Sequence, residues 1–79
     1  MLHLEIITPE KSLFAGEIKI VKLPGTLGSF EIMENHAPII STLTKGKIKV
    51  KDKNDHVTFF EISGGLIEAS NNQINVLVE

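Results

Sequence analysis

The 79-residue sequence contains no cysteine, arginine, tryptophan or tyrosine, and these absences narrow the range of possible functions. Without cysteine there is neither a disulfide framework nor a thiolate metal site, which favours an intracellular, reducing setting for so small a domain. Arginine is the side chain that most often reads phosphates and guanines, and eight lysines against ten acidic residues leave a formal net charge of −2. We therefore expect no nucleic acid as a partner.

Long hydrophobic runs are absent as well. Residues 1–10 lack the basic start and the extended apolar segment of a signal peptide, and no later segment is apolar over the length of a membrane span. A chain of this length supports a single hydrophobic core, so we expect residues 1–79 to form one domain.

The abundant residue types favour β-structure. Ile, Val and Thr together account for 21 residues and alanine for only three, which suits half-buried strands better than helices. Apolar and polar residues alternate between turn residues that recur at short intervals. The expected strands are residues 2–8, 13–15, 17–23, 28–33, 39–45, 47–52, 56–63, 66–70 and 73–79. We predict an all-β fold, a compact sandwich or barrel of two packed sheets.

His36 is the first candidate for a chemical role, because Glu31 and Glu34 closely precede it. His3 and His56 belong to other predicted strands and show no spacing typical of a metal site, and no nucleophile is paired with a base. A loop histidine more commonly forms a hydrogen bond to nearby backbone. We therefore expect no metal, no cofactor and no catalytic residue.

Alternating lysines form the second candidate site. They are Lys45, Lys47, Lys49, Lys51 and Lys53, and they could attract an anionic partner or lipid surface. Exposed edge strands commonly carry such lysines because these prevent pairing with other sheets. We favour this protective role here.

Three consecutive segments carry a resemblance to a known family. They are "LEIITPEKSLFAGEI" (4–18), "VKLPGTLGSFEIMENHAPIISTLTKGKIKV" (21–50) and "FFEISGGLIEASNNQINVLVE" (59–79). The Thr-Pro-Glu turn, the Pro-Gly loop, the Asn-His-Ala-Pro segment, the late Gly-Gly pair and the final apolar strand recur in order. Over its whole length the chain resembles the N-terminal β-sandwich domain of the epsilon subunit of bacterial F-type ATP synthases, called delta in mitochondria.

The resemblance implies a small β-sandwich of about ten strands in two sheets, and a non-catalytic rotor subunit in the central stalk of the enzyme. Such a subunit binds the gamma subunit and the c ring, contacts the alpha/beta hexamer only indirectly, and couples proton transport to ATP synthesis. It would lie peripherally on the cytoplasmic face of the bacterial inner membrane and meet the membrane only through the complex. Family members usually continue into a C-terminal helical hairpin, and because this sequence stops at Glu79 we expect no hairpin here.

The resemblance also implies where the subunit interface lies. Its expected residues are Gly28, Ser29, Phe30, Glu31, Asn35, His36, Ala37 and Pro38. The segment with Gly28, Ser29 and Glu31 would face the c ring, and the segment from Asn35 to Pro38 would lie at the gamma side or rim.

Two alternatives share the predicted all-β class. Lipoyl and biotinyl carrier domains are also small and poor in cysteine, but they need a modifiable lysine in a hairpin motif such as "MKM", which does not occur here. A generic ligand-binding sandwich would need an aromatic binding face, to which four phenylalanines contribute little.

Overall fold

The computed structural model describes residues 1–79 and contains eight β-strands and no helix, which confirms the predicted all-β fold. The strands are β1 (Leu2–Ile7), β2 (Ser12–Gly25), β3 (Gly28–Met33), β4 (Ile39–Leu43), β5 (Gly46–Asp52), β6 (Val57–Ile62), β7 (Gly65–Ser70) and β8 (Gln73–Val78). About ten strands were expected, and the number is smaller partly because residues 13–15 and 17–23 belong to one continuous strand, β2. No helix capable of crossing a membrane is present.

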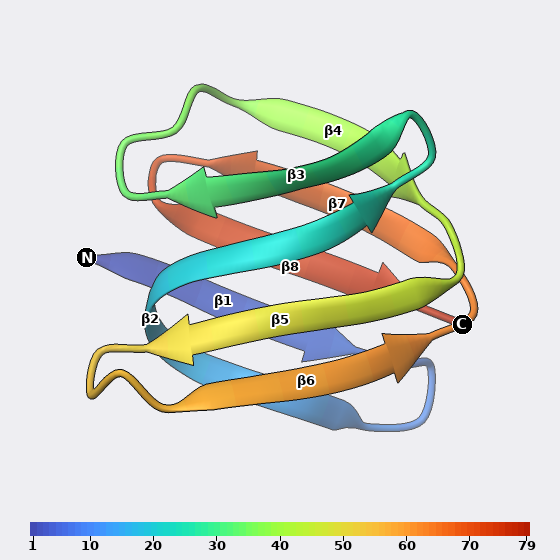
Figure 1. Ribbon diagram of the computed structural model, residues 1–79, viewed down its shortest axis with the longest axis horizontal. Helices are drawn as coiled ribbons and strands as arrows, with labels where there is room; N and C mark the ends of the chain where they lie inside the picture. The colour runs from blue at the N-terminus through green and yellow to red at the C-terminus, as the bar shows by residue number, and fades with distance from the viewer.

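The strands form two facing layers (Figure 1). The front layer consists of β3, the second half of β2, β5 and β6, and the back layer consists of β4, β7, β8, β1 and the first half of β2. All neighbouring strands are antiparallel except β1 and β8, which are parallel. The two expected sheets are therefore two layers of a single hydrogen-bonded sheet, because β2 belongs to both.

A β-bulge lets β2 pass from one layer to the other. The first half pairs with β1 as far as Ile18, and the second half pairs with β3 and β5. The pairing with β5 skips Lys19, and this extra residue reverses the alternation of side chains along the strand. As a result Ile18 before the bulge and Val21 and Leu23 after it are all buried in the core.

The core between the layers is entirely apolar. Sixteen buried hydrophobic residues form one cluster to which every strand contributes, and no buried residue is polar or charged. Phe14 of β2 and Phe60 of β6 meet edge to face, with ring centroids 6.0 Å apart. This pair covers the core where β6 and the first half of β2 are not hydrogen-bonded to each other.

The turns gather at the two ends of the sandwich (Figure 1). The right-hand end holds the turns at residues 8–11, 26–27, 44–45 and 63–64, and the left-hand end holds the segments 34–38, 53–56 and 71–72. The turn before β3 and the segment that follows β3 therefore lie at opposite ends of the molecule.

The close approach of β7 and β8 at Gly65 leads to the first prediction. A Cβ added at Gly65 would clash with the carbonyl oxygen of Leu77 and lie 3.2 Å from the Cα of Val78, and both are backbone atoms of β8. We expect Gly65→Ala to lower the free energy of unfolding by roughly 2 kcal/mol, because the two strands must move apart. Urea denaturation followed by circular dichroism measures the change.

Gly16→Ala is the matched control. The nearest atoms to a Cβ at Gly16 belong to the tip of the Phe14 ring, at 3.7 Å, which is an ordinary contact. This variant should be neutral or gain up to about 1 kcal/mol, because alanine restricts the unfolded chain. Equal destabilisation by both substitutions would contradict the close approach at Gly65.

Candidate interaction surfaces

The turn between β2 and β3 is firmly held and carries an apolar side chain at its tip. Gly25 and Gly28 pair across the turn, and Thr26 and Leu27 connect them. The Thr26 N–H donates to the carbonyl of Thr42 on β4 at 3.2 Å, and the hydroxyl oxygens of these two threonines lie 2.9 Å apart. Leu27 is fully exposed on this anchored turn. An apolar side chain held in place in this way suits an anchor for a partner protein.

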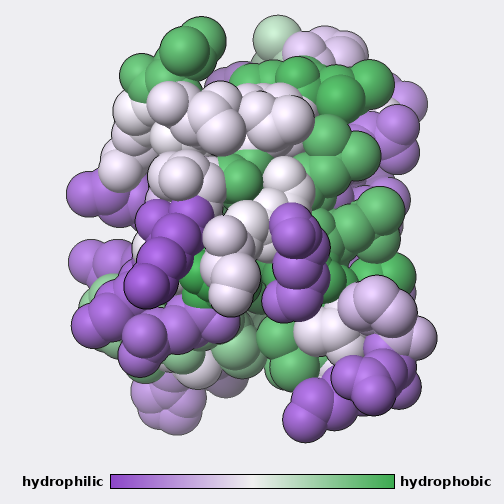
Figure 2. Space-filling view, turned by 90° about the vertical axis from the view of Figure 1, so that its right-hand side faces the viewer, coloured by the Kyte–Doolittle hydropathy of each residue, from purple (hydrophilic) through white to green (hydrophobic).

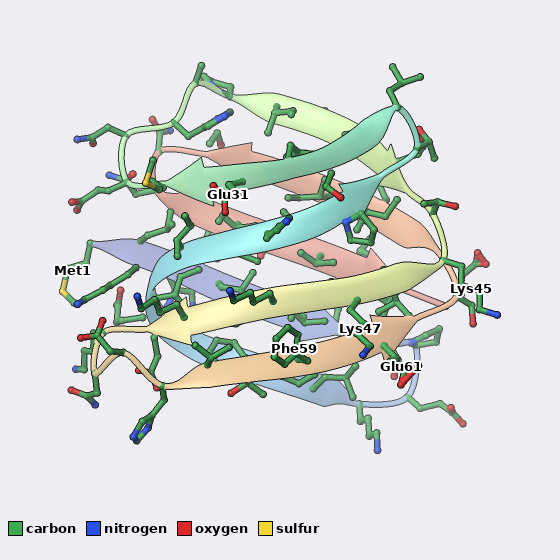
Figure 3. The ribbon with its side chains drawn as sticks, in the orientation of Figure 1. Met1, Glu31, Lys45, Lys47, Phe59 and Glu61 are labelled. Atoms are coloured by element: carbon green, nitrogen blue, oxygen red, sulfur yellow. The ribbon has the colours of Figure 1, made fainter.

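The first predicted interface segment is divided between three environments. Gly28 and Ser29 are exposed beside the turn. Phe30 is partly buried, packs against the core and lies over Gly25. Glu31 is exposed further along β3, directly opposite Lys22 in the register, and Figure 3 shows it on the front layer away from the turn. The structure therefore brings Gly28 and Ser29 together with Leu27, but not with Glu31.

The second predicted segment, Asn35–Pro38, lies at the left-hand end and is clasped to the turn between β7 and β8. The Asn35 N–H donates to Asn72 Oδ1 at 2.6 Å, and Asn72 Nδ2 donates to Asn35 Oδ1 at 3.2 Å. Both residues have positive φ, 67° and 61°, a conformation that asparagine tolerates better than most residues. Two turns far apart in the sequence thus hold each other in place.

His36 forms only local contacts. Its backbone N–H donates to the carbonyl of Met33 at 3.2 Å, and its ring Nδ1 lies 2.7 Å from the carbonyl oxygen of Ala37. The Glu34 carboxylate pairs instead with the amino group of Met1, at 2.7 Å. The predicted bond from His36 to nearby backbone is confirmed, and no group of three or more histidine or acidic side chains is placed to hold a metal.

The outer face of the back layer carries an apolar band that the sequence analysis did not identify. The band consists of Ile7, Ile40, Leu66 and Leu77. Register places Ile7 beside Leu77 and Leu77 beside Leu66, so these three form a row across β1, β8 and β7. Ile40 is 70% exposed and Leu77 is 48% exposed. In Figure 2 hydrophobic surface runs down the right-hand part of the view, where this layer lies.

Two adjoining hollows deepen this apolar band. Their volumes are about 390 Å³ and 470 Å³, and Ile7, Leu66 and Leu77 line both. Glu5 and Glu68 line the smaller hollow and Glu79 lines the larger one, so acidic groups border the apolar surface. A concave apolar surface with an acidic border is suited to the side chains of another protein.

An ion pair fixes the bulge of β2 to the turn between β5 and β6. Nζ of Lys19, the bulged residue, lies 2.6 Å from Oδ1 of Asp55, and Nζ of Lys51 lies 4.0 Å from the same oxygen. The hydrogen bond and the positive charge of Lys19, with a smaller effect of Lys51, hold the pKa of Asp55 below its ordinary value.

The structure is that of a small β-sandwich with two anchored turns and an apolar band on its outer face. A sequence profile described as "ATP synthase, Delta/Epsilon chain, beta-sandwich domain" matches residues 1–79. The chain belongs to this family.

Named relatives agree with the family assignment. The ATP synthase epsilon chain of Caulobacter vibrioides is 38% identical over 78 residues, covering 99% of this chain and 90% of that one. The epsilon chain of Chlorobium limicola is 40% identical over 76 residues, covering 96% and 86%. That of Alkalilimnicola ehrlichii is 35% identical over 78 residues, covering 99% and 56%. The chain therefore spans little more than half the length of some of its relatives.

Solved assemblies contain chains of the same fold. One belongs to the mitochondrial ATP synthase of Euglena gracilis, in a structure of OSCP, F1 and the c ring, with a TM-score of 0.92, 14% identity, and coverage of 98% of this chain and 49% of that one. Another belongs to the central stalk and c ring of the Tetrahymena thermophila enzyme, with a TM-score of 0.81, 16% identity, and coverage of 98% and 62%. At these identities the likeness concerns the fold alone.

The asparagine clasp leads to the second prediction. Asn72→Gly keeps the positive φ of the turn but removes both hydrogen bonds to Asn35. We expect faster hydrogen exchange at the Asn35 amide and a loss of about 1 kcal/mol in the free energy of unfolding. Asn71→Gly is the control, because Asn71 has φ of 51° in the same turn and takes no part in the clasp. If both variants accelerate exchange equally, the clasp does not hold the segment.

The ion pair at the bulge leads to the third prediction. Because the pKa of Asp55 is lower in the folded chain, the pair adds stability above the pKa of the unfolded carboxyl group, and this stability is lost as the pH falls through the folded pKa. Lys19→Gln should move the pKa of Asp55 back towards its ordinary value in a carboxyl NMR titration. Lys53→Gln, in the same turn as Asp55, should leave it unchanged, because Lys53 forms no ion pair with Asp55. An unaltered Asp55 titration in Lys19→Gln would refute the assigned cause.

Proposed function

We propose that this chain is a non-catalytic rotor subunit of an F-type ATP synthase that binds the gamma subunit and the c ring. In this role it couples proton transport to ATP synthesis and reaches the alpha/beta hexamer only indirectly. It would be peripheral, held on the cytoplasmic face of the bacterial inner membrane by the complex. Membership of the delta/epsilon family and relatives named ATP synthase epsilon chain support this proposal.

The apolar band is the observation that carries the proposal, and we assign it to the gamma subunit. Ile7, Leu66 and Leu77 form a continuous row with adjoining hollows. A sheet face that is exposed only to water would be expected to carry polar residues at these positions. The segment Asn35–Pro38 leads directly into β4 and Ile40, which supports placing it at the rim of the same contact. The acidic border formed by Glu5 and Glu68 favours basic residues on the gamma side.

The turn between β2 and β3 is assigned to the c ring. Leu27, Gly28 and Ser29 project from the right-hand end of the sandwich, separate from the apolar band on the outer face of the back layer. Thr26 fastens this turn to β4, so little conformational freedom is lost when a partner binds it. We place the centre of the contact at Leu27, and Glu31 at most at its margin.

The fourth prediction separates the two contacts. Leu66→Glu places a charge in the apolar band and should weaken binding to a complex of alpha, beta and gamma subunits by at least about tenfold, with little effect on c-ring binding. Leu27→Glu should weaken c-ring binding by a similar factor and spare gamma. Both residues are exposed, so both variants should fold, and circular dichroism checks this.

Each variant serves as the control for the other. Binding is measured with the isolated c ring and with the purified alpha/beta/gamma complex, by surface plasmon resonance. If Leu66→Glu weakened c-ring binding and Leu27→Glu weakened binding to the alpha/beta/gamma complex, the assignment of the surfaces would be wrong. A wild-type chain that binds neither partner would refute the proposed function itself.

A further inference from the structure

The outer face of the front layer carries four lysines, Lys22, Lys47, Lys49 and Lys51, which we call the basic face. The last three alternate along β5, and Lys22 of β2 lies directly opposite Lys49. Of the other alternating lysines, Lys45 precedes β5 and Lys53 follows it, at opposite ends of the strand. Compared with the alternating lysines of the sequence, the basic face therefore includes Lys22 from a distant strand and excludes Lys45 and Lys53.

The protective role expected for these lysines is wrong. β5 pairs with β2 on one side and with β6 on the other, so it has no free edge to protect. The edge strands of the front layer are β3 and β6, with the sequences "GSFEIM" and "VTFFEI", and neither contains a lysine. The basic face thus needs another explanation.

The lysines of the basic face repel one another and are only partly neutralised, by Glu31 opposite Lys22 and Glu61 opposite Lys47. Like charges directly opposite each other on paired strands are destabilising, and this applies to Lys22 and Lys49. Neither has a carboxylate within 4.0 Å, and the only one near Lys51 is Asp55, which is bound more closely by Lys19. An anionic partner would relieve this repulsion.

The basic face also contains a shallow hollow and apolar side chains. Lys22, Lys49 and Lys51 border a shallow hollow of about 240 Å³, together with Ile20, Val57 and the single acidic residue Glu31, so positive charge prevails in it. Beside it, Nζ of Lys47 lies 6.0 Å from the ring centroid of Phe59, whose side chain is 57% exposed. Positive charges alternate here with apolar side chains, which matches a peptide carrying both carboxylates and aliphatic groups.

Two glutamates distinguish a peptide from a lipid surface. Glu31 on β3 is paired in register with Lys22, and Glu61 on β6 is paired with Lys47. Figure 3 shows them on the two edge strands, on either side of β5. A flat anionic bilayer would meet both carboxylates, whereas an acidic segment lying along β5 passes between them.

We propose that the basic face binds an acidic segment of a partner protein. Its carboxylates enter the hollow between Lys22, Lys49 and Lys51, and its aliphatic side chains cover β6. This inference concerns the layer opposite the apolar band and does not rest on the function proposed above.

The test uses the full 79-residue chain and a fluorescent peptide of alternating glutamate and alanine, with alternating glutamine and alanine as the neutral probe. A variant with Lys22→Gln, Lys49→Gln and Lys51→Gln should bind the acidic peptide at least about tenfold more weakly in fluorescence anisotropy. The control variant carries Lys11→Gln, Lys45→Gln and Lys53→Gln. It removes the same charge outside the basic face and should stay within about twofold of the wild type.

A single substitution separates binding from folding. Lys49→Glu places a carboxylate opposite Lys22 and between Lys47 and Lys51, so it should raise the thermal midpoint by roughly 1–5 °C. The same variant should lose at least about tenfold in affinity for the acidic peptide. A more stable protein that binds more weakly would show that the lysines serve a partner at the expense of the fold.

Several outcomes would overturn the inference. These are equal losses in the two triple variants, equal binding of the acidic and neutral probes, or no binding of the acidic peptide by the wild type. Vesicles of phosphatidylglycerol, with phosphatidylcholine as the control, test the other source of negative charge. If the basic face binds these vesicles but not the acidic peptide, its ligand is a lipid headgroup and the inference fails.

Discussion

The passage of β2 through both layers is the constraint on which the rest of the structure depends. A strand that simply continued would turn Val21 and Leu23 outward, because side chains alternate with a period of two. The extra residue at Lys19 corrects the phase, and Asp55 holds that residue from the turn between β5 and β6. A domain without a disulfide thereby joins its two layers through continuous backbone and hydrogen bonds.

A few hydrogen bonds also position the exposed surfaces. Side-chain bonds to distant strands or turns hold two exposed segments, Thr26 to Thr42 at one end and Asn35 to Asn72 at the other. Segments held in this way lose little conformational entropy when they bind. The fold therefore presents the residues of both proposed contacts already in place.

Much of the fold could be predicted from the sequence, because alternation and turn residues are local signals. Residues 28–33 form a strand with the predicted bounds. The order of the strands depends on pairing between distant segments, so the interior place of β5 could not be predicted. The alternation of apolar and polar residues predicts one apolar face for each strand, so it does not reveal the apolar band. Adjacent apolar residues, such as Ile6 with Ile7 and Leu66 with Ile67, indicate that both faces of these strands are apolar. The motif predicts a surface position for Phe30, whereas its alternation with the buried Ile32 predicts the contact with the core that the structure shows.

The size of the domain gives this separation of surfaces a physical reason. The whole domain exposes only 4900 Å² of surface, and a typical stable interface takes roughly 800 Å² from each partner. One such interface would therefore occupy about a sixth of the surface, and several partners must share what the domain exposes. Apolar, basic and turn surfaces that point in different directions allow partners to bind without competing. Once one is bound, the others are held nearby at high effective concentration, so contacts that are individually weak combine into a lasting attachment. A rigid sandwich favours this arrangement because it keeps the surfaces at fixed angles to one another.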